Sequence, residues 1–488
     1  MQVLMHSMDM RKEAKHFDKP FWRSEKNMAR AKQKNKKNYH RLLGVVIVMI
    51  LFGLIMVLSA SHARAYASTG DSYYYIKKQL IAAGIGFAAL MFLSNVPLKT
   101  LQRMVRPAMW AAVGLLVAVL IPGIGKNAGG ATSWIPLGGF QIQPSELAKI
   151  AAILFTADFF SKRSRGLKDI RELYPYAGAI LLIILLIMKQ PDMGTTLALC
   201  ITLFVMLFVG GLNMKYIAAA ASLGTVSAIA LIFARSYRLN RITSFLNPNA
   251  DPLGNGWQIK QSLLAFGSGG LTGVGFGMSR QKYFYLPAAH TDFIFAIIGE
   301  ELGLLGTLFT ISLFALFAYY GIRISRQCKS QFGYLLGVGV TSMVALQAIV
   351  NMGTVTAVLP ITGIPMPFIS YGGSSLMANL AAVGILLSIA LEGNRGSASR
   401  RRRKPLRAVD GGDIEETTKK GKHRAKSSKK RARAKALEET SKARTKKVKK
   451  KEIRSRVNAS NNKRGRNSGS RVSGAGSRQS ATKSKKRS

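Results

Sequence analysis

The stretch Leu42–Ser59, LLGVVIVMILFGLIMVLS, is eighteen residues long and contains no charged side chain. A helix of that length crosses most of the roughly 30 Å hydrocarbon core of a bilayer. Small residues follow at Ala60, Ala63 and Ala65, as they do at the cleavage site of a secretory signal. The basic leader and the apolar stretch are both too long for such a signal, and further apolar stretches follow. The stretch therefore predicts a membrane-spanning helix.

Similar apolar stretches recur as far as Leu391, and polar segments separate them. Because one span needs about 17–25 apolar residues, the pattern predicts an all-α integral membrane protein with ten transmembrane helices. The predicted spans are 42–60, 79–96, 106–123, 146–160, 174–189, 194–211, 215–234, 292–320, 332–355 and 374–391. The stretch from Thr291 to Tyr320 is longer than one span needs and contains Glu300, Glu301 and Gly303, so we expect this helix to tilt or break.

Lysine and arginine gather in three short connections, 97–106, 161–173 and 321–331. The positive-inside rule places these connections in the cytoplasm. With an even number of spans, both termini of this multi-pass protein of the cytoplasmic membrane then lie in the cytoplasm too. The outward connections are 61–78, 124–145, a large extracytoplasmic loop at about 235–291, and 356–373. Three of these four contain nearly all the unusual local sequence, so we expect the chemistry on the outer face.

Both ends of the chain are strongly basic and contribute most of the formal net charge of +49. Residues 1–41, the predicted cytoplasmic arm, hold 12 Lys and Arg against 4 Asp and Glu, and residues 392–488 hold 35 against 8. The second segment has almost no large apolar side chains, so we expect a disordered tail. Such a tail binds anionic lipid headgroups, nucleic acid or an acidic partner, or is simply solvated, and the lack of aromatic residues disfavours specific nucleic-acid recognition.

The two cysteines give no sign of a disulfide or a metal site. Cys200 lies inside an apolar stretch and Cys328 lies in a short basic connection. Redox chemistry is therefore not indicated.

The outward connection before the fourth span ends in the motif Gln143-Pro-Ser-Glu146. Pro144 suits the first turn of a helix, which places Glu146 and Lys149 three residues apart on one helical face. A plain local ion pair is the simpler interpretation, but a lysine a turn inside an apolar span is costly and favours a functional one. Asp192, in Gln190-Pro-Asp192, is most simply a helix cap.

His290 and Asp292 stand at the entrance of the long apolar helix. Asp292 either satisfies the N–H groups at the start of that helix or acts chemically. The glycine-rich stretch Gly267–Gly277 before it lacks the strand–helix unit of a dinucleotide site, and we interpret its glycines as permitting tight turns and close backbone packing. Pro- and Gly-rich backbone at 365–375 contains Ser370 and Tyr371, which can contact sugar or backbone. No base partner makes Ser370 a nucleophile.

Taken together, the motifs resemble the SEDS family of shape, elongation, division and sporulation proteins, which includes FtsW, RodA and SpoVE. They are Gln-Pro-Ser-Glu at 143–146, Gln-Pro-Asp at 190–192, His-Thr-Asp-Phe at 290–293, Glu-Glu-Leu-Gly at 300–303 and Ile-Ser-Tyr-Gly-Gly-Ser-Ser at 369–375. The resemblance covers about residues 42–391 and is closer to FtsW and SpoVE than to RodA. Two departures exist. Family members usually have an acidic or polar residue where Ala288 or Ala289 stands, and a basic residue just before the tryptophan that Thr132 and Ser133 precede here.

The resemblance implies a peptidoglycan glycosyltransferase that polymerises lipid II, the undecaprenyl-diphosphate-linked disaccharide pentapeptide, in complex with a class B penicillin-binding protein. It places the family's essential aspartate at Asp292, which we expect to deprotonate the acceptor hydroxyl. We expect a helix N-terminus to keep this carboxylate ionised but weakly basic. A pyrophosphate leaving group needs no second carboxyl group as a proton donor, so one base plus cations suffices.

The remaining expected site residues contact the substrate. Lys149 is the leading candidate for binding the diphosphate, Glu146 orients it, and the further candidates are Arg238, Arg241, Lys282, His290, Ser370 and Tyr371. A divalent cation, Mg²⁺ or Mn²⁺, bridging Asp292 to the diphosphate is a further hypothesis, and no organic cofactor is expected. Glu300 and Glu301 are expected to pack or accept hydrogen bonds.

Two other functions remain open. The alternatives to the glycosyltransferase are a flippase for the same lipid and a scaffold that recruits a class B penicillin-binding protein. The FtsW-like motifs favour the division septum and contacts with other divisome proteins.

Overall fold

The computed structural model describes residues 25–128, 131–138, 140–163, 170–234 and 236–402. The predicted disordered tail was residues 392–488, and its first part, up to Arg402, is instead helical, because it continues α13. The rest of that tail and residues 1–24 of the predicted arm lie outside these ranges. The helices are α2 (Glu25–Thr69), α3 (Tyr74–Asn95), α4 (Leu98–Ala118), α5 (Pro144–Ser161), α6 (Tyr174–Lys189), α7 (Met193–Val209), α8 (Met214–Phe233), α9 (Ser236–Leu246), α10 (Asn255–Gly269), α11 (Ile294–Gln327), α12 (Gln331–Val355) and α13 (Gly373–Arg402). A short 3-10 helix, Ile170–Leu173, precedes α6.

Every predicted span overlaps one of these helices, and the described chain contains seven helices long and apolar enough to cross a membrane. The chain is therefore a multi-pass membrane protein. The other three overlapping helices are α4 and α5, which each carry three charged residues, and the shorter α7, of 17 residues. The count of ten spans stays a prediction.

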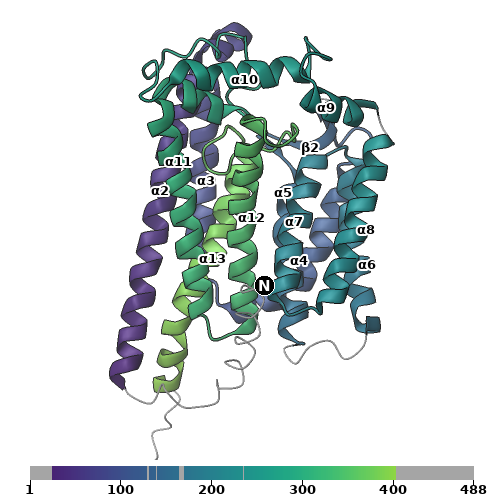
Figure 1. The fold of residues 1–488 in the computed structure, drawn as a ribbon. Coiled ribbons are helices and arrows are strands. Elements are labelled where there is room, and N and C mark those ends of the chain that lie inside the picture. The colour runs from purple at the N-terminus through teal and green to yellow at the C-terminus, as the bar shows by residue number, and fades with distance from the viewer. Residues whose placement is uncertain (1–24, 129–130, 139, 164–169, 235, 403–488) are drawn as a thin grey trace, which may run out of the picture. The chain divides into compact units, whose positions relative to one another are not determined.

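The outward loop before α5 contains a small antiparallel sheet, which the all-α prediction missed. Its strands are β1 (Lys126–Ala128), β2 (Ala131–Leu137) and β3 (Phe140–Ile142), in the order β1-β2-β3. Strands this short are stabilised by what they pack on, and here β3 leads directly into Pro144 at the start of α5. Figure 1 shows β2, α9 and α10 at the same end of the helix bundle. We call this end the outer end, following the predicted topology.

Helices α12 and α13 form the buried centre of the bundle. Of the residues in their most apolar stretches, 72% and 83% are buried, against 6% in α8, which lies at the edge of the bundle (Figure 1). Helix α13 packs closely along α3, because a Cβ added to Gly384 would lie only 2.6 Å from the Leu90 carbonyl oxygen. Close approach through glycine is how membrane helices pack, since lipid provides little hydrophobic drive for their association.

The long helix α11 breaks at Gly303, as expected. Gly303 has φ +64° and ψ −157°, a conformation open to glycine, and it separates residues 294–302 from the rest of the helix. We call residues 294–302 the half-helix. The loop from Leu286 to Phe293 is therefore followed by a short helical unit, the half-helix, that is separate from the rest of α11.

Candidate functional site

Asp292 lies at the outer end, two residues before the first residue of α11. Helix α11 has no side-chain cap, so the interpretation of Asp292 as a capping residue is wrong. Among the described residues, no group donates a hydrogen bond to its half-buried carboxylate. Its backbone is fixed instead, because Asn351 Nδ2 donates to the Asp292 carbonyl oxygen over 2.7 Å and to the Ile364 carbonyl oxygen over 2.8 Å. The structure thus fixes the position of Asp292 and leaves its reactive group unbonded.

The protein surroundings make Asp292 a better base than an ordinary aspartate. Burial raises the pKa of Asp292 to about 6, Arg241 acts in the opposite direction, and the nearby Asp192 raises it further. We expected a helix N-terminus to hold this carboxylate weakly basic, and the structure differs because desolvation outweighs the favourable charge. At neutral pH the group is mostly ionised and still binds a proton readily.

Arg241 and Arg238 both lie on α9 but have different surroundings. Arg241 is half-buried, donates from Nη1 to the Ile361 carbonyl oxygen at 3.4 Å, and lies close enough to influence Asp292. Arg238 is buried and donates from Nη1 to the Leu231 carbonyl oxygen at 2.9 Å, in the last turn of α8. Arg241 is therefore the candidate cation beside Asp292, whereas Arg238 binds the end of a helix.

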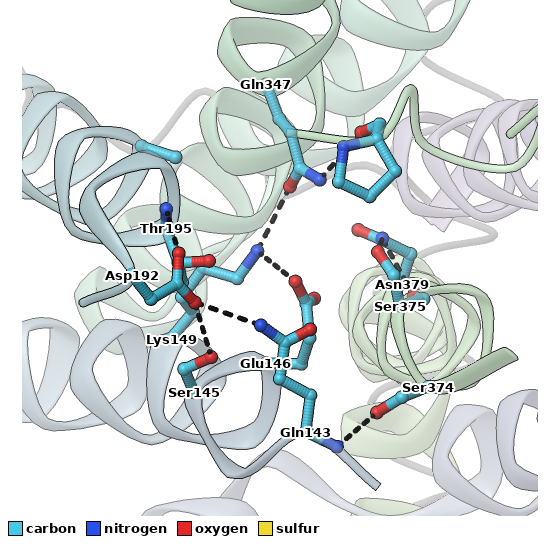
Figure 2. A network of polar contacts seen from close by, with 12 residues as sticks. Gln143, Ser145, Glu146, Lys149, Asp192, Thr195, Gln347, Ser374, Ser375 and Asn379 are labelled. Atoms are coloured by element: carbon cyan, nitrogen blue, oxygen red, sulfur yellow. Dashed lines mark hydrogen bonds and ion pairs between the residues drawn. The ribbon is translucent and has the colours of Figure 1, made fainter. Parts of the chain in front are cut away.

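Asp192 caps α7, as predicted, and also joins two helices. Its Oδ1 accepts from Thr195 N at 3.0 Å, while its Oδ2 accepts from Gln143 Nε2 at 2.9 Å and Ser145 Oγ at 3.2 Å. Figure 2 shows these contacts converging on one carboxylate between α5 and α7. The Gln-Pro-Ser-Glu and Gln-Pro-Asp motifs thus lie together in space.

Glu146 and Lys149 form the predicted ion pair, and it is buried. Lys149 Nζ lies 3.0 Å from Glu146 Oε1 and 3.1 Å from Gln347 Oε1, and the lysine side chain is 1% exposed. Gln347 in turn donates from Nε2 to the Pro365 carbonyl oxygen at 3.1 Å (Figure 2). The ammonium is thus already paired, and its predicted direct contact with phosphate stays a prediction.

The side chains of His290 and Tyr371 lie close together. The His290 ring lies 4.6 Å from the Tyr75 ring and 5.6 Å from the Tyr371 ring, and Tyr371 N donates to the His290 carbonyl oxygen at 2.9 Å. Burial, with a smaller effect of Arg64, lowers the pKa of His290 to about 4, so this ring is neutral at physiological pH. Burial also raises the pKa of Tyr371 to about 12, so its phenol stays protonated and available as a donor.

Ser370 holds the backbone of its own loop. Its Oγ accepts from Met366 N at 2.8 Å, and its carbonyl oxygen accepts from Gln79 Nε2 at 3.1 Å. Ser370 is thus bound through its hydroxyl to a backbone N–H and through its carbonyl oxygen to a side chain of α3. Its predicted contact with substrate stays a prediction.

Lys282 lies apart from this group, in a buried pair with Glu301. Their Nζ and Oε1 atoms are 2.9 Å apart, and the two side chains are 5% and 0% exposed. Glu300 accepts hydrogen bonds from the same turn, so the expected packing and hydrogen-bonding role of both glutamates is confirmed. A lysine neutralised in this way offers no free charge to a diphosphate in this conformation.

No group of three or more His, Cys, Asp and Glu side chains suited to a metal ion occurs within the described residues. A divalent cation here would rest on a single carboxylate, Asp292, plus oxygens from a bound diphosphate. Mg²⁺ commonly binds through one or two carboxylates and substrate phosphates, so the unbonded Asp292 fits such an ion.

Sequence reasoning missed four residues that build this site. Gln143 and Ser145 lie within a recognised motif, but their partner Asp192 is 47 to 49 residues away. Gln347 and Asn351 lie one turn apart on α12, and both are almost fully buried. The sequence did contain a signal for this pair, because Gln347 and Asn351 lie inside an apolar span, where burying a polar side chain costs free energy and indicates a specific role.

The fold and the site define a polytopic membrane protein whose polar side chains converge at one end of the helix bundle. The family model described as "Cell cycle protein", which covers FtsW, RodA and SpoVE, matches residues 39–395, so the chain belongs to this family. The predicted family is confirmed.

Two curated relatives are similar over nearly their whole length. Stage V sporulation protein E of Bacillus subtilis is 45% identical over 357 residues, which is 72% of this chain and 98% of that protein. A probable peptidoglycan glycosyltransferase FtsW of Trichlorobacter lovleyi is 41% identical, covering 71% of this chain and 92% of that protein.

Solved structures share the fold. A chain from a structure on the coordination of polymerization and crosslinking by a peptidoglycan synthase complex aligns with a TM-score of 0.59 and 26% identity, covering 72% of this chain and 96% of that one. The rod shape determining protein RodA of Thermus thermophilus aligns with a TM-score of 0.54 and 27% identity, over 72% and 95% of the two chains.

Proposed function

We propose that this protein is a peptidoglycan glycosyltransferase that polymerises lipid II at the outer face of the cytoplasmic membrane. The observation that carries the proposal is the Asp292 carboxylate, which is held by its backbone, receives no hydrogen bond from the described chain and lies near Arg241. The relative named as a probable peptidoglycan glycosyltransferase supports the same activity.

Asp292 acts as the general base. It removes the proton from the acceptor sugar hydroxyl, whose oxygen attacks the anomeric carbon of the second lipid-linked sugar while undecaprenyl diphosphate departs. A pKa of about 6 suits this role, because the group is deprotonated at pH 7 and is still a stronger base than an ordinary aspartate.

Arg241 stabilises the departing diphosphate. A guanidinium group binds phosphate oxygens in a bidentate manner. Within the described residues, the one hydrogen bond of the Arg241 side chain is long, 3.4 Å to the Ile361 carbonyl oxygen. The Lys149 ammonium, paired with Glu146, donates to Gln347 Oε1, and Gln347 Nε2 donates to the Pro365 carbonyl oxygen. This chain of hydrogen bonds fixes the loop at Pro365. A divalent cation held by Asp292 would add positive charge on the same diphosphate.

The same proposal includes the setting of the enzyme. It has ten spans, both termini in the cytoplasm, and a class B penicillin-binding protein as its transpeptidase partner at the division septum. The structural similarity to a chain of a peptidoglycan synthase complex supports the partner, and the FtsW relatives support the septum. The anionic or acidic partner of the basic tail stays a proposal outside the described residues.

The test is polymerisation of purified lipid II by the full-length chain in nanodiscs. The variant is Asp292→Asn, and the matched control is Asp71→Asn, an exposed aspartate paired with Lys77 at the same end. We expect loss of a general base to slow glycan formation by about 10²- to 10⁴-fold, whereas the control keeps its rate. Normal polymerisation by Asp292→Asn would overturn the proposal that Asp292 is the general base. A wild-type chain that yields no polymer even with its transpeptidase partner would favour a flippase, and polymerisation that persists in the reconstituted pair after substitution of the outer-end site would favour a scaffold.

A further inference from the structure

The half-helix, residues 294–302, is a short rigid unit with an important residue at each end. Asp292 precedes its outer end, and Glu300 and Glu301 lie at its inner end. Nine residues span about 13 Å of helix. Because the chain breaks at Gly303, the rest of α11 does not by itself fix the position of this unit.

Residues 270–282, which we call the glycine segment, fill the break. Val274 N and Gly275 N donate to the Glu300 and Glu301 carbonyl oxygens at 3.0 and 3.1 Å. Leu304 N and Leu305 N, beyond the break, donate to the Gly270 and Leu271 carbonyl oxygens at 2.9 and 3.2 Å. The segment thus satisfies backbone groups that an unbroken helix would pair internally.

Glycine is required for this approach. A Cβ on Gly273 would lie 2.1 Å from the Glu301 carbonyl oxygen, and one on Gly303 would lie 2.4 Å from Gly273 N. This close backbone packing is the role predicted for the glycine-rich stretch.

The two glutamate side chains hold the end of the same segment. Glu300 accepts from Arg280 N at 2.9 Å and from Ser279 Oγ. Glu301 accepts from Ser59 Oγ of α2 at 2.7 Å and pairs with Lys282 at 2.9 Å. Lys282 also donates to the Gly277 carbonyl oxygen at 2.6 Å.

Side-chain packing does little to hold the glycine segment. Leu271, Phe276 and Met278 are 71%, 54% and 68% exposed. The buried charges are therefore the main side-chain attachment between the segment, α2 and the half-helix, in a place where an unpaired charge would be costly.

We propose that Glu301 and Lys282 are positioning residues for Asp292. The ion pair between Glu301 and Lys282 fixes the half-helix and thereby places the Asp292 carboxylate against the substrate. This inference rests on the proposed function. Neither residue touches the reacting atoms, and Asn351 provides the second fixed point, at the outer end of the same unit.

The test compares Glu301→Gln and Lys282→Met with the charge-preserving Lys282→Arg in the full-length chain. Lys77→Gln, which breaks an exposed ion pair at the outer end, is the matched control. The measurements are kcat and KM for lipid II polymerisation, the pH–rate profile and the thermal unfolding midpoint. A displacement of about 1 Å at a catalytic group costs up to about 100-fold, so we expect kcat to fall about 10- to 100-fold. KM should change less than about threefold, because ground-state binding is kept.

Positioning also predicts a shift in the acid limb of the pH–rate profile, because the burial of Asp292 changes when the half-helix moves. Lys282→Arg and Lys77→Gln should keep both kcat and that limb. The inference is overturned if Lys282→Met folds and retains wild-type kcat, or if kcat falls with an unmoved acid limb and a fall in melting temperature that accounts for it. If Glu301→Gln fails to fold, the comparison of Lys282→Met with Lys282→Arg decides the matter. If Asp292→Asn polymerises normally, the proposed role of Asp292 as the base is wrong. If Asp292→Asn is inactive but Lys282→Met is fully active, only this inference is wrong.

Discussion

Asp292 and Glu146 are both outer-end carboxylates of the same bundle, but their surroundings are opposite. Glu146 is almost fully buried and paired with Lys149, whose ammonium also binds Gln347. Asp292 is half-buried, near a cation, and receives no hydrogen bond within the described chain. A satisfied charge stabilises structure, whereas a charge left without protein donors has a raised pKa and remains available to a ligand.

The largest stability effect should come from breaking the satisfied pair. Removing one partner of a buried ion pair leaves an uncompensated charge, so Lys149→Met should lower the free energy of unfolding by about 3 kcal/mol. Thermal unfolding in detergent measures this loss. The double variant Lys149→Met with Glu146→Gln, which removes both charges, should recover most of it. Equal instability of the single and double variants would show that the pair is not what matters.

The opposite sign is expected at Asp292. Its pKa in the folded protein, about 6, exceeds the usual 3.8, so its favourable contribution is complete below pH 3.8 and is lost as pH rises through 6. Asp292→Asn should therefore stabilise the protein at pH 7.5 by up to about 3 kcal/mol, less the part that solvent screening removes at this half-buried side chain. Melting curves at pH 4 and pH 7.5 test this, since the gain should be small at the lower pH. A destabilised variant at pH 7.5 would contradict the contrast with Glu146.

Arg241 should set the pH at which Asp292 loses its activity as a base. The wild-type polymerisation rate should fall as pH drops through about 6, because the base becomes protonated. Arg241 lowers the pKa of Asp292, so Arg241→Met should move this acid limb to higher pH. The pH dependence of kcat/KM measures the shift, with Arg238→Met as the control on the same helix. An identical shift in both variants would remove the special role of Arg241.

The smallest effect should come from an exposed pair. Lys77 and Asp71 lie 2.8 Å apart, but their side chains are 64% and 39% exposed. Solvent and salt screen such a pair, so Lys77→Gln should leave the free energy of unfolding nearly unchanged. A loss as large as that of Lys149→Met would mean that burial does not explain the contrast.

Much of the fold was predictable because long apolar stretches in a membrane protein have few alternatives. Without water, backbone groups must pair internally, and helices result. The break at Gly303 was also predictable, from two glutamates and a glycine inside an over-long span. The sheet at 126–142 was missed, since its strands are as short as three residues and lie in a loop that resembled a simple connection.

The candidate site was less accessible to sequence reasoning. Asp292 and the Glu146–Lys149 pair could be identified from local motifs and spacing. The contacts of Asp192 with Gln143 and of Asn351 with the Asp292 backbone join segments 49 and 59 residues apart, which no local pattern encodes. The pairing of Lys282 with Glu301 likewise depends on how the chain folds back at Gly303, and spacing alone left Lys282 among the phosphate candidates.

Helix α2 is 45 residues long, so it is much longer than a bilayer is thick. The 17 residues before Leu42 continue as helix for about 25 Å along its axis. Charges separated from a surface by more than the roughly 8 Å Debye length of physiological salt are largely screened from it. Only the part of this basic helix next to the membrane is then attracted to headgroups, and its far end extends into solution as a stiff cationic rod, within reach of acidic surfaces that lie away from the lipid.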